Sequence, residues 1–249
     1  MLKINSLDNN YLKHLVRLRE NKKHRQESGT ILLMGKKIVG EICSLCKAKA
    51  VLSCGEYGTG KFSSEKHYNI TESVLKKITG LSSPEDIVAE FSMPDLPCPD
   101  IISHLLVLDS ISDPGNLGTL MRTALALGWD AIYLLDGGVD PYNDKTLRAA
   151  KGSHFKLPIL EGGSEDLKEL VDKHDIQLLV ADMKGEAISN ISLDKGCALV
   201  LGNESHGPSD FIKREGLAVT IPISNKMESL NVAVAGAILL YTLGDYCER

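Results

Sequence analysis

Short apolar segments alternate with helical patterns after residue 104, and this alternation limits the fold of the chain more than any other feature. The segments lie at 105–108, 131–135, 178–181, 197–201 and 217–221. Each is too short for a helix and fits a strand that is buried on both faces. Strands that alternate with helices predict a parallel sheet covered by helices, so we expect an α/β fold. Ligands of such sheets bind beyond the carboxyl ends of the strands.

A proline-rich stretch divides the chain into two predicted domains. The segment 91–100 reads FSMPDLPCPD, and its three prolines exclude a regular helix or a central strand. We therefore predict a first domain at 1–97 and a second at 98–249. The first domain is predicted to be a small α/β domain from its own periodic segments. Its helical patterns lie at 11–20, 36–45 and 71–79, and its strand patterns at 30–33, 50–54 and 87–91.

Positive charge is concentrated in the first predicted domain, although the whole chain carries a net charge of −5. Residues 1–97 contain 15 Lys or Arg and 11 Asp or Glu, whereas residues 98–249 contain 13 and 22. Seven of the basic residues fall within 1–25. A nucleic-acid backbone is the natural partner of such a segment, although a solvated helix face has the same composition. We interpret the excess as an RNA-binding surface.

The first of the predicted strands after the linker is followed by a turn and a helix that carries an arginine. Pro114, Gly115 and Asn116 are a strong turn signal, and Asn116 is expected to cap the helix. Gly118 and Arg122 are four residues apart and share a helix face. Taken alone, Arg122 is slightly better explained as a solvated surface charge, which is the commoner role of such a residue. Because Gly118 has no side chain, it would let an anion come close to this face of the helix and to Arg122.

Two later segments repeat this order of strand, polar turn and helix. LVLGNESHGPS at 199–209 contains Glu204, and IPISNKMESLNVAVAGAILLY at 221–241 contains Ser229 and Asn231 before an alanine-rich helix. With the first segment they match three motifs in order: NxGxxxR, LGNExxG, and IP followed by SLN. From about residue 105 to its end, the chain therefore resembles the SpoU (TrmH) branch of the SPOUT RNA methyltransferases.

The resemblance implies a fold and partners for both domains. SPOUT catalytic domains have a parallel sheet with a C-terminal trefoil knot, bind S-adenosyl-L-methionine in the knotted loops, and are generally homodimers. The first domain resembles the ribosomal L30e-like substrate-binding domain of rRNA-directed members. It departs from them at Met34, because those members often have a glutamate before the glycine that is Gly35 here. We therefore assign no function of that glutamate to this chain.

The resemblance also implies roles for residues of the three motifs. Arg122 is expected to activate the ribose 2′-hydroxyl. Because an arginine is effectively always protonated, it suits stabilisation of the developing alkoxide better than proton removal, and both roles stay open. The other expected catalytic residues are Asn116, Glu204, Ser229 and Asn231. The residues expected to bind the cofactor are Leu201, Gly202, Asn203, Ile221, Ile223, Ser229 and Leu230.

These expectations favour an S-adenosylmethionine-dependent enzyme that methylates a ribose 2′-hydroxyl of RNA. The first domain favours rRNA as the substrate. One alternative is a ribose methyltransferase of tRNA, and another is a catalytically inactive RNA-binding or assembly factor with the same fold. The intact set of motif residues argues against the inactive protein. No motif encodes which nucleotide is methylated, because loops and RNA shape determine that choice.

Several other classes of protein are disfavoured. No GxGxxG motif is present, and GEYGTGK at 55–61 has Phe62 where a P-loop needs Ser or Thr. Ser205 and His206 are adjacent and lack the GxSxG turn of a hydrolase. The longest apolar run, at 232–243, is too short for a bilayer span, and the N-terminus lacks a signal sequence. We expect a cytoplasmic protein.

The six cysteines predict reduced thiols and no metal centre. The chain is long for a disulfide scaffold and has no secretory signal. Cys43 and Cys46 form a CxxC pair, but no second pair or histidine cluster lies at zinc-site spacing. We expect Val39, Ile42, Cys43 and Cys46 to share the buried face of a helix.

Overall fold

The computed structural model describes residues 2–4, 6–55 and 62–244 of the chain, which forms two compact units. The first unit consists of Met1–Pro94 together with Tyr142–Gly152, and the second of Asp95–Pro141 together with Ser153–Arg249. Most of the GEYGTGK segment lies outside the described residues, as does Cys247. Within the described residues, no helix has both the length and the apolar sequence needed to cross a membrane.

The second unit is built on a six-stranded sheet in the order β11-β9-β10-β6-β7-β8, and every neighbouring pair of strands is parallel. The predicted parallel α/β fold is therefore confirmed. The sequence did not predict β8, because its half-buried ILEG segment lacks the continuous apolar run of the other strands. The strands are β6 (His104–Leu108), β7 (Ala131–Leu135), β8 (Ile159–Gly162), β9 (Gln177–Ala187), β10 (Cys197–Leu201) and β11 (Leu217–Thr220).

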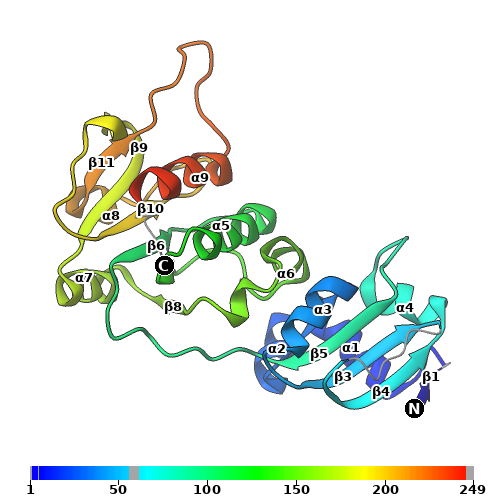
Figure 1. The fold of residues 1–249 in the computed structure, drawn as a ribbon. Coiled ribbons are helices and arrows are strands. Elements are labelled where there is room, and N and C mark those ends of the chain that lie inside the picture. Colours follow the sequence, from blue (N-terminus) through cyan, green and yellow to red (C-terminus); the bar gives the residue numbers. More distant parts are fainter. Residues whose placement is uncertain (1, 5, 56–61, 245–249) are drawn as a thin grey trace. The chain divides into compact units, whose positions relative to one another are not determined.

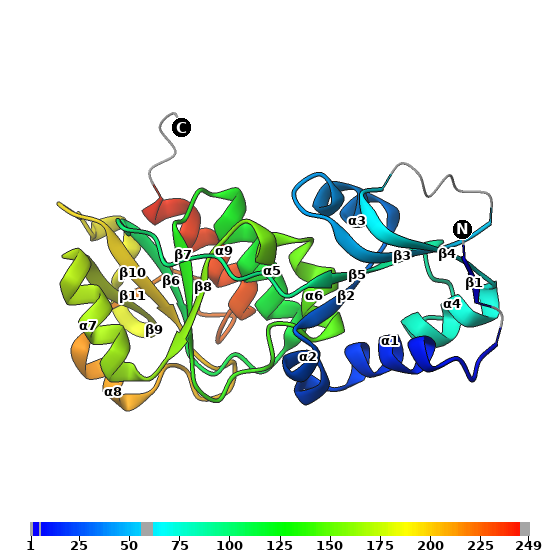
Figure 2. The same cartoon turned by 90° about the horizontal axis from the view of Figure 1, so that it is seen from below.

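Helices cover both faces of this sheet (Figure 1). α5 and α9 pack against each other on one face, and α9 contacts β10. α7 and α8 lie on the opposite face (Figure 2). Leu167 and Val171 of α7 and Ile212 of α8 belong to the core of strand residues there. Burial on both faces explains why the central strands are apolar throughout. The helices are α5 (Pro114–Ala126), α7 (Ser164–His174), α8 (Asp210–Glu215) and α9 (Val232–Leu243).

α9 approaches α5 closely because Gly236 has no side chain. A Cβ atom at Gly236 would lie 2.3 Å from Leu120 Cδ2 and 2.6 Å from Leu201 Cδ1, so an alanine would force these leucine side chains or α9 to shift. Near the other end of α9, the indole N–H of Trp129 donates to the backbone carbonyl of Leu240 at 3.3 Å. These contacts hold α9 against the sheet over most of its length.

The first unit contains a mixed five-stranded sheet in the order β1-β4-β3-β5-β2. β4 pairs parallel with β1 and β3, whereas β5 pairs antiparallel with β3 and β2. The predicted strands at 30–33, 50–54 and 87–91 correspond to β2, β3 and β5. The strands are β1 (Leu2–Ile4), β2 (Thr30–Met34), β3 (Ala48–Cys54), β4 (Ser64–Ile70) and β5 (Ile87–Ser92).

Helices α1 and α4 bury their apolar faces in the core of this unit, and α6 contacts β2. The sequence did not predict α2, whose residues KKHRQES have no apolar periodicity. Its ends explain why it forms: the Asn21 side chain accepts from the His24 N–H at 2.9 Å, and Gly29 follows in the left-handed conformation. The helices are α1 (Asn10–Glu20), α2 (Lys22–Ser28), α3 (Lys36–Cys43), α4 (Glu72–Thr79) and α6 (Asp144–Ala150).

The CxxC pair lies at the end of α3. Val39, Ile42 and Cys43 are buried on the helix, as expected, but Cys46 is exposed because α3 ends at Cys43. The prediction that Cys46 shares the buried face is therefore wrong. Cys43 and Cys46 are both free thiols; burial raises the pKa of Cys43, and partial desolvation raises that of the exposed Cys46.

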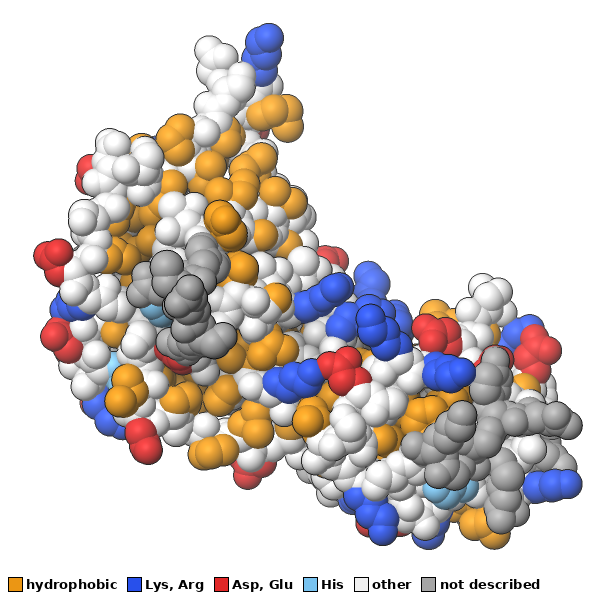
Figure 3. All heavy atoms as spheres, in the orientation of Figure 1, with side chains coloured by type: hydrophobic (Ala, Val, Ile, Leu, Met, Phe, Trp, Pro, Cys, Tyr) orange, Lys and Arg blue, Asp and Glu red, His pale blue; other side chains and the backbone are white. Residues whose placement is uncertain are grey.

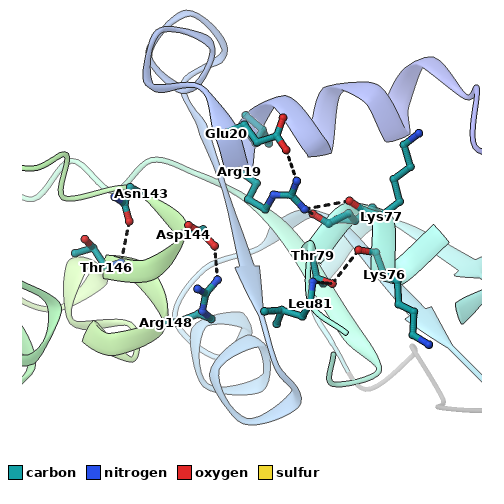
Figure 4. A network of polar contacts seen from close by, with 12 residues as sticks. Arg19, Glu20, Lys76, Lys77, Thr79, Leu81, Asn143, Asp144, Thr146 and Arg148 are labelled. Carbon is teal, nitrogen blue, oxygen red and sulfur yellow. Dashed lines mark hydrogen bonds and ion pairs between the residues drawn. The ribbon is translucent and has the colours of Figure 1, made fainter. Parts of the chain in front are cut away.

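Polar contacts tie helix ends within the first unit (Figure 4). Arg19 of α1 pairs with Glu20 and donates to the backbone carbonyls of Lys77 and Ile78, at 3.1 and 2.9 Å, near the end of α4. The last carbonyls of a helix have no partner within it, so Arg19 both satisfies them and joins the two helices. α6 is held by the pair between Asp144 and Arg148 and by its cap, Asn143 (Figure 4).

A buried carboxylate organises the polar part of the first unit. Glu90 of β5 is 5% exposed and accepts from the Tyr11 hydroxyl at 2.5 Å and from His14 Nε2 at 2.9 Å. The Nδ1 atom of His14 lies 2.9 Å from Nε2 of His24, so the network reaches α2. Burial alone would raise the pKa of Glu90, but hydrogen bonds from His14, Tyr11 and Thr30 lower it overall.

We expect Glu90→Gln to lower the free energy of unfolding of the first unit by about 1–3 kcal/mol at pH 7, because a buried ionised acceptor is lost. The pKa of Glu90 is lower in the folded state than in the unfolded state. Its ionised carboxylate therefore stabilises the fold at pH values above the unfolded pKa. That contribution is lost as the pH falls through the folded pKa. Denaturant titrations at pH 7 and pH 3.5 should show the difference between wild type and variant shrinking in acid. Glu65→Gln on β4, an exposed carboxylate, is the control. An equal loss at both pH values would contradict the role of the charge.

Candidate active site

The first motif follows β6 and begins α5. Asp113 precedes the helix and accepts from the Asn116 N–H at 2.8 Å, and Pro114 occupies the first helical turn. The expectation that Asn116 caps α5 is therefore wrong, because the helix starts two residues earlier than Asn116. The pre-set φ of Pro114 favours that start. This start leaves the Asn116 side chain available for a long-range contact.

Glu204, from the turn after β10, makes that contact. Its carboxylate accepts from the Asn116 side-chain amide at 3.0 Å, from the Ser112 hydroxyl and N–H at 2.7 and 3.0 Å, and from the Asp113 N–H at 3.2 Å. Partial desolvation alone would raise the pKa of Glu204, but the hydrogen bonds from Asn116 and Ser112 lower it to about 2. Glu204 is therefore ionised at neutral pH and joins the second motif to the first.

Asn231 brings the third motif into the same network. Its side-chain amide donates to Asn116 Oδ1 at 3.1 Å, while its own Oδ1 caps α9 by accepting from the Ala233 and Val234 N–H groups. Asn116 therefore uses both ends of its amide, one toward Glu204 and one toward Asn231. Three loops that are far apart in the sequence meet at this one side chain.

A cavity of about 610 Å³ opens beside this junction. Its walls are formed by the middle of β9, the loop after β10, the end of β11 with the loop that follows it, and the first part of α9. Of the residues expected at the site, those that line it are Leu201, Gly202, Asn203, Glu204, Ile221, Ile223, Ser229, Leu230 and Asn231. The cavity is also lined by residues outside the expected site: Ala181, Asp182, Met183, Pro208, Val219, Thr220, Val232, Ala235 and Leu239. Only the position of Asp182 beyond the predicted strand 178–181 offered a signal for these.

The turn after β10 is shaped by two residues of the second motif. A Cβ atom at Gly202 would lie 2.1 Å from the backbone nitrogen of Pro208, so only glycine fits there. The Asn203 side chain donates to the Ser110 carbonyl at 2.9 Å and accepts from the Ser205 N–H at 2.9 Å. Asn203 thereby closes its own turn and ties it to the loop after β6.

Arg122 lies apart from the cavity. Its side chain is exposed on α5, it does not line the cavity, and no hydrogen bond or ion pair is formed with it in the part of the chain that the structure describes. Gly118, one turn earlier, is buried, so the two residues do not form a shared open face. The expected catalytic residues thus divide into a joined set around Asn116, with Ser229 on the cavity wall, and a separate, unpartnered cation.

Comparison with known proteins bears on both units. Residues 103–241 match the SpoU rRNA Methylase family, and residues 9–89 match the MRM3-like substrate binding domain. The chain is 32% identical to the 23S rRNA (guanosine(2553)-2′-O)-methyltransferase RlmP of Bacillus subtilis, over 98% of this chain and 99% of that protein. It is 36% identical to the 23S rRNA (adenosine(1067)-2′-O)-methyltransferase of Streptomyces azureus, over 55% of this chain and 52% of that protein.

A solved structure agrees with these matches. The AdoMet-bound rRNA methyltransferase from Sinorhizobium meliloti has a TM-score of 0.87 to this chain at 29% identity, and covers 97% of this chain and 96% of its own. The family match extends over more than half of the sequence and contains all three motifs. The resemblance inferred from Asn116, Glu204 and Asn231 is therefore confirmed, and the chain belongs to the SpoU rRNA Methylase family.

Proposed function

We propose that this protein transfers a methyl group from S-adenosylmethionine to a ribose 2′-hydroxyl of rRNA. The observation that carries the proposal is the hydrogen-bonded junction of Asn116, Glu204 and Asn231 beside the 610 Å³ cavity. The names of the relatives from B. subtilis and S. azureus support 23S rRNA as the substrate.

The cavity fits S-adenosylmethionine in size and chemistry. Small-molecule sites usually enclose about 300–1,000 Å³, with mostly apolar walls and a few polar groups. Here Leu201, Ile221 and Leu230 offer apolar contacts for an adenine ring, and Ser229 and Asn231 offer polar contacts. We propose that Gly202, Asn203 and Ile223 complete the cofactor site. The sulfonium of the bound cofactor supplies the electrophilic methyl group.

The residues around Asn116 prepare the site before RNA binds. Ionised Glu204 fixes the Asn116 amide, and Asn116 fixes the start of α9 through Asn231, so the walls of the cavity keep their shape. Positioning of this kind lowers the barrier because the reacting groups need no further alignment. We propose that Arg122, which no described residue holds, contacts the RNA and stabilises the alkoxide that develops on the ribose.

The test is a methylation assay with radiolabelled S-adenosylmethionine and separate RNA substrates. Protein-free 23S rRNA, 16S rRNA and bulk tRNA are incubated with the enzyme, and labelled nucleosides are identified by mass spectrometry. We expect 2′-O-methylated nucleosides from 23S rRNA. Label in tRNA alone would favour the tRNA enzyme, and label on a base would exclude ribose methylation. Binding of the cofactor without transfer to any RNA would favour an inactive assembly factor.

We also propose that residues 1–97 form an RNA substrate-binding domain and 98–249 the methyltransferase domain with the trefoil knot of its family, acting in the cytoplasm. The match of 9–89 to a substrate-binding domain supports the first assignment. Exposed cations on its helices support it further. Arg17, Lys22 and Lys77 form no ion pair within the described residues, whereas the neighbouring acids Glu20, Glu27 and Glu72 are each paired.

Reversing two of these charges should weaken RNA binding. We expect Arg17→Glu with Lys22→Glu to lower affinity for 23S rRNA fragments at least about tenfold and to reduce the salt dependence by about two units of slope. The measurement is fluorescence anisotropy between 50 and 200 mM KCl. Lys173→Glu with Lys195→Glu in the second unit makes the same change in net charge and should have little effect. Equal losses in both double variants would show only a general effect of net charge.

An exposed apolar face on α9 supports the proposal of a homodimer. Val234, Ile238 and Tyr241 are 50%, 39% and 62% exposed, and their spacing places them on one side of the helix. Hydrophobic side chains gather on this part of the surface (Figure 3). Monomeric proteins rarely leave such a stripe uncovered. A second copy of α9 would cover it.

We expect Ile238→Glu to convert the dimer to a monomer, because a charge at the centre of an apolar interface has no partner. Sedimentation equilibrium at micromolar protein should then give a mass near the 27.1 kDa of one chain. Leu45→Glu changes an apolar residue of the first unit that is more exposed, at 55%, and should leave the dimer intact. A wild-type protein that is monomeric at these concentrations would refute the dimer.

A further inference from the structure

The charged groups of the cavity are both acidic. Among the described residues that line it, Asp182 and Glu204 carry charge, and no lysine or arginine does. The remaining wall consists of backbone, neutral polar groups and apolar side chains. A site lined in this way favours a ligand with net positive charge over a neutral one of the same shape. The two carboxylates differ in how many hydrogen bonds they accept from the protein.

The carboxylate of Glu204 is committed to the protein. Both of its oxygen atoms accept hydrogen bonds from the loop after β6, through Ser112, Asp113 and Asn116. These four donors offset much of its charge locally. Glu204 is therefore occupied in joining the motifs.

The carboxylate of Asp182 is only partly committed. Its Oδ1 atom accepts from the backbone N–H of Lys184 at 2.9 Å, and its Oδ2 atom lies 3.9 Å from Nζ of Lys213, beyond hydrogen-bond length. The side chain is 25% exposed and sits on the cavity wall. Asp182 thus keeps an oxygen atom that receives no hydrogen bond from the described residues.

We infer that Asp182 makes the site prefer S-adenosylmethionine over S-adenosylhomocysteine, an inference that rests on the proposed function. During transfer the bond from sulfur to the methyl carbon breaks and its electron pair stays on sulfur, while the ribose oxygen bonds the methyl and releases its proton to water. The cofactor therefore changes from net charge +1 to 0. A carboxylate on the cavity wall stabilises the bound cation more than the neutral product, so the product leaves more readily.

The test compares the binding of the two ligands by isothermal titration calorimetry. Asp182→Asn keeps the shape of the side chain and removes its charge. We expect it to lower the preference for S-adenosylmethionine over S-adenosylhomocysteine about tenfold, mainly through weaker binding of the former. Sinefungin, which carries an ammonium near the position of the sulfonium, should weaken in parallel. Glu169→Gln removes an exposed charge on α7 and should leave all three affinities unchanged.

A second variant should change the preference for S-adenosylmethionine in the opposite direction. Lys213→Met removes the cation nearest to Asp182 and should raise the preference for S-adenosylmethionine, which guards against an Asp182→Asn protein that folds poorly. Equal weakening of both ligands in Asp182→Asn would overturn the inference, since Asp182 would then bind a group that both share. Unchanged affinities would overturn it too. A wild-type protein that binds neither ligand would instead refute the proposed function.

Discussion

Replacing Arg122 by alanine should lower the rate of methyl transfer by at least about 100-fold, the size expected when a single charge-stabilising donor is lost from a transition state. The affinity for S-adenosylmethionine should stay within about threefold of wild type, because Arg122 does not line the cavity. Single-turnover rates with 23S rRNA and calorimetric titration of the cofactor measure the two quantities separately.

Two further variants sharpen this result. Arg122→Lys keeps the charge but loses the planar fork of the guanidinium, so we expect a rate between those of wild type and Arg122→Ala. Thr119→Ala, an exposed position one turn earlier on α5, should have the wild-type rate. Normal turnover by Arg122→Ala would remove this residue from the mechanism. A parallel loss of cofactor affinity would mean that it acts on the cavity instead.

Replacing Glu204 by glutamine should have the second largest effect. Glutamine presents an NH₂ group to a site that now contains only donors, from Ser112, Asp113 and Asn116. We expect the Asn116 contact to break and the rate to fall by about 10- to 100-fold, together with weaker cofactor binding, because positioning of the loops is lost. Since Glu204 is solvent-exposed, the second unit should lose only about 1 kcal/mol of stability.

The pH dependence gives a second readout for Glu204. Its pKa of about 2 lies below the unfolded value, so its contribution to stability is present above about pH 4.5 and is lost as the pH falls toward 2. Between pH 5 and 9, the pH profile of wild-type activity should therefore show no rise or fall caused by ionisation of Glu204. Asp210→Asn, an exposed carboxylate nearby on α8, is the control. An acidic limb near pH 6 that disappears in Glu204→Gln would contradict the lowered pKa.

The sequence carried enough local information for most of the fold. Continuous apolar segments predicted the central parallel strands because burial on both faces demands them. Several segments were not predicted, among them β1 and α6. Two of the missed segments had weak local signals: β8 is half-buried, and α2 depends on its caps, Asn21 and Gly29. The sequence also did not predict which buried polar residues form hydrogen bonds with each other. Glu90 and His14 are 76 positions apart, and no spacing rule connects them.

For the candidate site, the sequence by itself determined which residue types are present and in which motifs they occur, and the motifs alone sufficed to identify the family. Only the tertiary structure decided how they are connected. Asn116 joins Glu204 and Asn231 across 88 and 115 positions, Asp113 replaces Asn116 as the helix cap, Arg122 stands apart, and Asp182 enters the cavity wall. The physical reason is that hydrogen bonds and cavity walls depend on strand order in the sheet, which brings distant loops to one edge.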